Sequence, residues 1–394
     1  MNENNAIKYV RNGEKTSSPH TPEHTKQLLH ALGDPTRKMK VIKVYGEVGK
    51  SVLCARLCRM LTDARYSVGL ISLTHAESAS KDSILMNGSP ISGERFTQSV
   101  NRMAEALQTL PASDITPTSE ELLLVSGILC LEALGCNILI LEIASIPHSA
   151  VLALNTPLLN VITKIHTPPV ANTVCSLFDK TSEETVSVLQ SPEVVRILTE
   201  RCAQVNCRLT FPIKSNFYHM EHTLAKIRFF YDKQEYVLSS GALYEIDTAL
   251  GLIEGYRALT RRGLRLLPTE LANALYANAD KGHFSIFSVT PTILLDCATT
   301  PASLSSLFET LRLHEDMLGN EFDAWTAPAY AETVTEAFLK ENTPRLCSLL
   351  TIDEKNPYKA VKLALRNRVN DRPIIVLGDS IFLAYIDRTL KGFL

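Results

Sequence analysis

The residue pattern with the clearest chemical meaning is a short glycine loop, Gly46-Glu47-Val48-Gly49-Lys50-Ser51. A β-branched run at 41–45 precedes it, and apolar residues at helical spacing follow it. In such a loop, backbone N–H groups and the helix N-terminus cradle phosphates, a lysine adds positive charge, and a hydroxyl can hold Mg²⁺. A full Walker pattern would have glycine at Val44, so only the shorter form, G-x-x-G-K, is present. We therefore predict nucleotide binding here, with a plain glycine turn and a solvated lysine as the alternative.

The elements around this loop predict an α/β fold with a parallel sheet. Strand-like runs occur at 41–45, 68–73, 137–142 and 159–163, and an amphipathic helix is expected at 118–135 with Thr118 as its N-cap. A strand, glycine loop, helix and strand in succession imply parallel pairing. We expect a P-loop-like, mostly parallel sheet flanked by helices.

The sequence predicts consecutive domains, each formed by one continuous stretch of the chain. Residues 1–24 are polar and are expected to form a flexible leader, followed by an ATP-binding domain at 25–280. A smaller C-terminal α/β domain is expected at 281–394, with two strands in 282–296, a helix at 302–313 and a central strand at 373–378. No clear strand is expected directly after the 302–313 helix.

Composition excludes several classes of protein. The chain has 394 residues, of which 45% are hydrophobic and 21% charged, so it is neither disordered nor fibrous. Its net charge of −2 argues against non-specific nucleic-acid binding. The nine cysteines contain no C-x-x-C pair and are expected to be reduced thiols in the cytoplasm. There is no 18-residue apolar stretch and no secretory signal pattern, so neither a membrane nor a nucleic-acid partner is expected.

Nine short segments, in order along residues 25–394, carry a family resemblance. They are 32–35 (L-G-D-P), 46–52 (G-E-V-G-K-S-V), 69–75 (G-L-I-S-L-T-H), 87–92 with Phe96 (N-G-S-P-I-S…F), 118–121 (T-S-E-E), 141–143 (L-E-I), 161–163 (V-I-T), 296–301 (D-C-A-T-T-P) and 378–383 (G-D-S-I-F-L). In these segments and in their order, the chain resembles the folylpolyglutamate synthase/dihydrofolate synthase family, a branch of the Mur ligase superfamily.

The resemblance implies an ATP-dependent amide ligase. Such an enzyme phosphorylates a carboxylate with ATP, and an amine, here glutamate, displaces phosphate from the acyl phosphate of a folate-type acid. The implied catalytic residues are Lys50, Glu142 and Asp296. The implied metal ligands for Mg²⁺ are Ser51, Glu142 and His166, and the implied nucleotide-binding residues are Gly46, Gly49, Lys50, Ser51, Asp247, His283 and Asp296. The partners would be small molecules, and the chain a monomer or weak oligomer.

Several family positions are changed. The family's T-N within the loop is Glu47-Val48, which puts a negative charge beside a phosphate loop. The family's histidine after V-I-T falls on Pro169, three residues from His166, and the family's arginine before the second domain is His283. The family's modified lysine has Lys180 as its only candidate here.

Two rival functions remain open beside the ligase. The first is a diverged, catalytically weak relative that serves as a nucleotide-binding or scaffold module. The second is a P-loop ATPase of the partitioning type, which would not need a second domain bearing Asp296.

Overall fold

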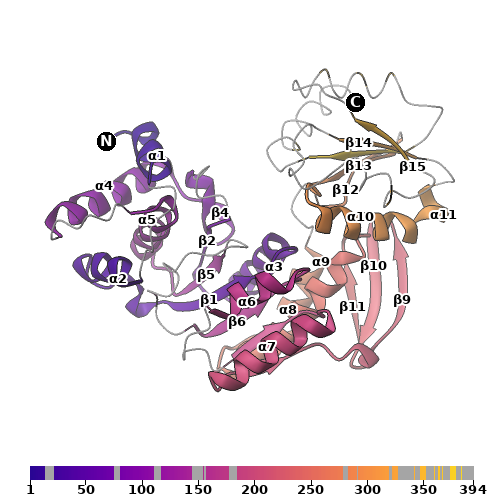
Figure 1. The fold of residues 1–394 in the computed structure, drawn as a ribbon, viewed down its shortest axis with the longest axis horizontal. Helices are drawn as coiled ribbons and strands as arrows, with labels where there is room; N and C mark the ends of the chain where they lie inside the picture. Colours follow the sequence, from indigo (N-terminus) through magenta and orange to yellow (C-terminus); the bar gives the residue numbers. More distant parts are fainter. Residues whose placement is uncertain are drawn as a thin grey trace. The chain divides into compact units, whose positions relative to one another are not determined.

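We describe the chain from a computed structural model (Figure 1). The structure describes residues 1–13, 22–74, 80–110, 117–143, 154, 157–176, 184–277, 283–290, 292–318, 322–326, 341, 347–351, 359, 363, 366, 373–378 and 383. Within these ranges, no helix has the length and apolar character needed to cross a membrane.

The chain forms two compact units, and each contains two stretches of sequence. The first unit consists of Met1–Pro212 and Asp247–Ala274, and the second of Ile213–Ile246 and Leu275–Leu394. The structure therefore differs from the linear division near residue 281, because residues 213–246 belong to the second unit. Membership of a unit depends on packing between residues distant in sequence, which local patterns do not reveal.

An eight-stranded sheet forms the centre of the first unit (Figure 1), in the order β4-β3-β2-β5-β1-β6-β7-β8. All pairs from β2 to β8 are parallel, and only β3 and β4 at one edge run antiparallel. The strands are β1 (Lys40–Tyr45), β2 (Val68–Ser72), β3 (Ile84–Met86), β4 (Ser89–Pro90), β5 (Ile138–Glu142), β6 (Leu159–Ile162), β7 (Glu184–Ser187) and β8 (Arg208–Thr210). The mostly parallel sheet that the sequence predicts is confirmed.

Helices flank this sheet, and several share one hydrophobic core with it. The helices are α1 (Glu3–Arg11), α2 (Pro22–Ala31), α3 (Lys50–Asp63), α4 (Gly93–Thr109), α5 (Ser119–Ala133), α6 (Pro168–Ser176), α7 (Pro192–Gln204), α8 (Tyr244–Arg261) and α9 (Pro268–Tyr276). Buried side chains of α1, α2 and α4 to α7 belong to a single cluster with strand residues such as Ile71 and Leu139. Thr118 caps α5 in a capping box with Glu121, as expected.

Helix α1 occupies a stretch that was expected to be flexible. Asn2 caps the helix by accepting the N–H of Asn5 at 2.9 Å, and Ala6 and Val10 are fully buried. Helix α1 packs on α4 and α5. The leader prediction is therefore wrong for residues 3–11, whereas residues 14–21 lie outside the described part. Only Ala6 and Val10 are fully buried, with Ile7 partly buried against the same core, and these are too few to give a clear apolar period.

The second unit contains a five-stranded sheet in the order β12-β13-β16-β14-β15. Its strands are β12 (Ser285–Val289), β13 (Thr292–Asp296), β14 (Phe322–Thr326), β15 (Cys347–Thr351) and β16 (Ile374–Leu377). Strand β12 is antiparallel to β13 and the other pairs are parallel, with β16 central as predicted. The expectation of no clear strand after α10 (Pro301–Leu313) is wrong. Strand β14 was missed because polar Asp323 and small Ala324 interrupt its apolar residues.

A three-stranded antiparallel sheet completes the second unit, in the order β11-β10-β9. Its strands are β9 (Phe217–Thr223), β10 (Lys226–Tyr231) and β11 (Gln234–Leu238), and a short helix, α11 (Glu315–Leu318), follows α10. These strands belong to the stretch that the sequence had assigned to the first domain.

Candidate nucleotide site

The glycine loop lies between the carboxyl end of β1 and the start of α3. Gly46 and Gly49 have φ angles of 122° and 88°, which side-chain-bearing residues rarely adopt. A Cβ on Gly46 would lie 2.4 Å from Oγ1 of Thr163, and one on Gly49 would lie 2.9 Å from Oγ1 of Thr248. Both glycines are therefore required for this loop shape, as the motif predicts.

The Lys50 side chain folds back over the loop. Its Nζ donates to the carbonyl oxygens of Gly46 at 2.7 Å and of Glu47 at 3.2 Å. Burial lowers the pKa of Lys50, and the negative charge of Glu142 is the largest influence that opposes this lowering. An ammonium group thus lies at the loop where a phosphate-binding lysine belongs.

Ser51 and Glu142 meet at the end of the loop. Glu142 is the last residue of β5, which is the neighbour of β1 in the sheet, and it is 4% exposed. The Ser51 hydroxyl donates to Oε1 of Glu142 at 2.6 Å. A hydroxyl and a carboxylate in contact form an oxygen donor set that fits Mg²⁺. No group of three or more His, Cys, Asp and Glu side chains suited to a metal occurs among the described residues. The donor set here therefore fits an ion that takes its other ligands from phosphate and water.

The Glu47 carboxylate points to the start of α6. Its Oε2 accepts the backbone N–H groups of His166 and, at 3.3 Å, of Thr167, which directly precede α6. A carboxylate is favourable at a helix N-terminus, since it satisfies orphan donors and complements the helix dipole. The negative charge of Glu47 beside the loop thus has a structural role, since it binds the backbone that precedes α6. The predicted ligand His166 has an exposed side chain, and its backbone is bound to Glu47.

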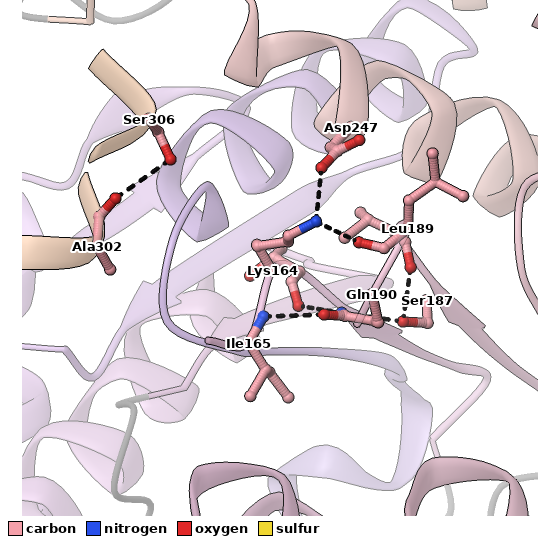
Figure 2. Close-up of polar contacts among 10 residues, drawn as sticks. Lys164, Ile165, Ser187, Leu189, Gln190, Asp247, Ala302 and Ser306 are labelled. Carbon is pink, nitrogen blue, oxygen red and sulfur yellow. Dashed lines mark hydrogen bonds and ion pairs between the residues drawn. The ribbon is translucent and has the colours of Figure 1, made fainter. Parts of the chain in front are cut away.

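Lys164 contacts the loop through its backbone and Asp247 through its side chain. The N–H groups of Glu47 and Val48 donate to the Lys164 carbonyl at 2.9 and 3.2 Å. Figure 2 shows the Lys164 ammonium between Oδ2 of Asp247, at 3.2 Å, and the Leu189 carbonyl, at 2.9 Å. Asp247, predicted as a nucleotide contact, is therefore the ion-pair partner of Lys164. Sequence reasoning missed this role of Lys164, although its position directly after the 161–163 strand was a usable signal.

Gln190 fixes the backbone on either side of Lys164. Its amide accepts from the Ile165 N–H at 3.0 Å and donates to the Thr163 carbonyl at 2.8 Å and to the Ser187 hydroxyl at 3.1 Å (Figure 2). The carbonyl that receives the loop N–H groups is therefore held by contacts that extend to β7.

In the second unit, Asp296 is buried at the end of β13 and accepts three hydrogen bonds. The donors are the Tyr244 hydroxyl at 2.6 Å, the Phe284 N–H at 2.9 Å and the Ala298 N–H at 2.9 Å. Burial raises the pKa of Asp296, and the charge of His283 is the largest opposing influence. Thr300 caps α10. The predicted residues Asp296 and His283 are thus brought close together within this unit.

Lys180, the candidate for the family's modified lysine, is outside the described residues.

The fold of this chain resembles that of solved folylpolyglutamate synthase structures. The apo form of L. casei FPGS matches with a TM-score of 0.83 over 100% of both chains, at 17% identity. The E. coli FolC protein in complex with DHPP and ADP matches with a TM-score of 0.77 over 100% of this chain and 98% of that chain, at 16% identity.

Sequence comparison finds relatives with related names, each over a shorter stretch. A dihydrofolate synthase/folylpolyglutamate synthase of Bacillus subtilis is 33% identical over 99 residues, which cover 25% of this chain and 23% of the relative. A dihydrofolate synthetase of Saccharomyces cerevisiae is 33% identical over 81 residues, 21% of this chain and 18% of the relative. The aligned part thus spans about a quarter or less of these relatives. No family model matches the chain. The family resemblance inferred from the motifs is confirmed.

Proposed function

We propose that this chain is an ATP-dependent ligase that adds glutamate to a folate-type acid through an acyl phosphate. The observation that carries the proposal is the glycine loop of the first unit, where the Lys50 ammonium contacts the Gly46 carbonyl and the Ser51 hydroxyl contacts Glu142. The named functions of the two sequence relatives support the reaction class. A matching structure that is an FPGS–AMPPCP–folate complex supports ATP and a folate as substrates.

Each predicted residue receives a role in this proposal. Gly46 and Gly49 leave room for phosphate oxygens, and Lys50 supplies positive charge to them. Ser51 and Glu142 would hold Mg²⁺, with His166 as a further ligand, and the ion would neutralise charge on the transferred phosphate.

Three further residues are assigned to the nucleotide. They are Asp247, His283 and Asp296. Asp296 also satisfies three donors of its own unit, so its substitution tests the fold as well as catalysis. Lys50 is therefore the better residue for a functional test.

A second candidate, a nucleotide-binding or scaffold module without turnover, is favoured by a specific observation. The backbone N–H groups of Glu47 and Val48 both donate to the Lys164 carbonyl. Groups that would bind phosphate in a ligase are engaged internally, and this arrangement suits a protein that has lost catalysis.

The test begins with titration of ATP and Mg²⁺ into the wild-type chain by calorimetry. We expect Lys50→Ala to weaken ATP binding by about tenfold or more, because a hydrogen bond to a charged group contributes about 1.5–3 kcal/mol. Arg59→Ala is the matched control, since Arg59 is an exposed cation on the same helix, paired with Asp63. Equal affinity of wild type and Lys50→Ala would contradict the phosphate role of the loop.

An assay with ATP, glutamate and a folate then separates the two candidates. A glutamyl product formed in step with phosphate release supports the ligase. ATP binding without product in any folate form supports the module, and the absence of ATP binding at millimolar concentration contradicts both the ligase and a nucleotide-binding module.

A further inference from the structure

The second unit places a cysteine against a histidine. Cys297 follows β13, and its Sγ lies 3.1 Å from Nδ1 of His283. Both side chains are partly exposed. A thiol at this distance from an imidazole can transfer its proton to the ring, and the resulting thiolate is a far better nucleophile than the thiol.

The residue that follows His283 is anchored within the second unit. Phe284, the residue after His283, has a φ of 44°, in the left-handed region that an aromatic residue rarely adopts. Its N–H donates to Asp296 at 2.9 Å, and its buried ring stacks on His314. The backbone N–H and the ring of Phe284 both have partners, so the chain directly after His283 is fixed.

Two titratable groups lie near this pair. Burial raises the pKa of Asp296, and the charge of His283 is the largest influence that opposes this rise. Tyr244 donates its hydroxyl to Asp296, and burial raises the pKa of Tyr244 well above its ordinary value, so the phenol stays neutral. Asp296, the residue before Cys297, therefore has the Tyr244 hydroxyl as a hydrogen-bond partner.

The other described cysteines provide a contrast. Burial raises the pKa to about 11 for three of them, Cys130, Cys136 and Cys175. Cys207 is partly exposed, as Cys297 is, but its Sγ lies 3.1 Å from the Thr185 hydroxyl and 3.6 Å from the Arg208 carbonyl. Cys207 also interacts with the Cys202 thiol. A hydroxyl, a carbonyl and a thiol do not take up the Cys207 proton at neutral pH, so Cys207 serves as a partly exposed reference thiol.

We propose that Cys297 and His283 form a reactive thiol–imidazole pair, in which Cys297 is the site of oxidation by hydrogen peroxide and of alkylation by small soft electrophiles. The Cys297 thiolate attacks one peroxide oxygen and the O–O bond breaks. The leaving hydroxide takes the proton of the His283 imidazolium and becomes water. The sulfur is oxidised to a sulfenic acid while the peroxide is reduced to water. This chemistry needs neither ATP nor a folate, although His283 is also assigned to the nucleotide in the proposed ligase.

Alkylation of the full chain by iodoacetamide tests the pair, with the rate at each cysteine read by peptide mass spectrometry. At about pH 6 we expect Cys297 to react about tenfold faster than Cys207, because the gain in thiolate fraction exceeds the loss of intrinsic nucleophilicity. His283→Gln should remove this advantage at Cys297 and leave the rate at Cys207 unchanged.

Peroxide treatment followed by dimedone tests the oxidation directly. The sulfenic-acid adduct is expected at Cys297 and not at Cys207, and Cys297→Ser should abolish it. A Cys297 that reacts no faster than Cys207 in the wild-type chain would overturn the proposal, and this comparison needs no variant. Buried Cys54 and Cys130 report on folding, since they would become reactive in a variant that unfolds. A correctly folded His283→Gln chain with an unchanged Cys297 rate would also overturn it.

Discussion

Lys43 lies in the middle of β1, a central strand of the first unit, and is 3% exposed. Burial lowers its pKa from 10.5 to about 8, because the charged amine is poorly solvated there. Its register partner on β6 is Asn160, which is also buried. The centre of the sheet therefore carries a polar pair where an apolar residue would be ordinary.

The lowered pKa of Lys43 predicts a pH dependence of stability. From pH 8 up to its unfolded pKa of 10.5, the unfolded chain holds a proton that the folded chain releases, so the free energy of unfolding rises with pH. The full effect corresponds to about 3 kcal/mol. Urea unfolding from about pH 7 to about pH 9.5 should show this rise in wild type and not in Lys43→Met. Lys40→Met, at the exposed end of the same strand, is the control. Parallel curves for wild type and Lys43→Met would contradict the prediction.

At the scale of elements, α1 provides a test of the N-terminal packing. Val10→Ala should lower the free energy of unfolding by about 2 kcal/mol, because it removes two buried methyl groups from the core formed with α4 and α5. Lys8→Ala on the exposed face of the same helix should change it by less than about 0.5 kcal/mol. Urea unfolding measures both. If the two variants were equally stable, residues 3–11 would behave as the leader that the sequence suggested.

Elements with local signals were predictable from the sequence. Strand β1, its loop and α3 follow from a β-branched run, two glycines and one apolar face, and the cap of α5 follows from Thr118 and Glu121, three residues apart. Strands β9 to β11 also have a strand-like pattern, but nothing local indicates which unit they join. Helix α1 and β14 have too few apolar residues in series to be recognised.

In the candidate site, too, residues with a local sequence signal were predictable, and residues that act through distant partners were not. The loop residues Gly46, Gly49 and Lys50 were identified from spacing alone. The role of Glu47 was missed because its acceptor function involves His166, 119 residues further along the chain. The same holds for Asp247, whose partner Lys164 is 83 residues away. Contacts of this kind depend on the sheet order, which a single sequence does not display.

At the scale of the whole molecule, the second unit depends on residues 213–246, which precede the last part of the first unit in sequence. The Leu243 N–H donates to Oγ1 of Thr310 at 3.1 Å, and Nε2 of His314, which is fully buried, contacts the Gly241 carbonyl at 2.7 Å. The Tyr244 hydroxyl donates to Asp296 at 2.6 Å. The segment 241–244 is therefore bonded to both α10 and the end of β13.

This arrangement predicts that residues 281–394, the second domain as read from the sequence, do not fold alone. The fragment would leave Asp296 and His314 without these partners, at about 1–3 kcal/mol for each lost buried bond, and would also lack β9 to β11. Losses of this size approach the total stability of a domain, about 5–15 kcal/mol. Residues 213–246 joined to 275–394 by a glycine–serine linker should instead unfold cooperatively in urea, as followed by circular dichroism. A cooperative transition of the 281–394 fragment at the same midpoint as the joined protein would show that the 213–246 segment contributes nothing to the second unit.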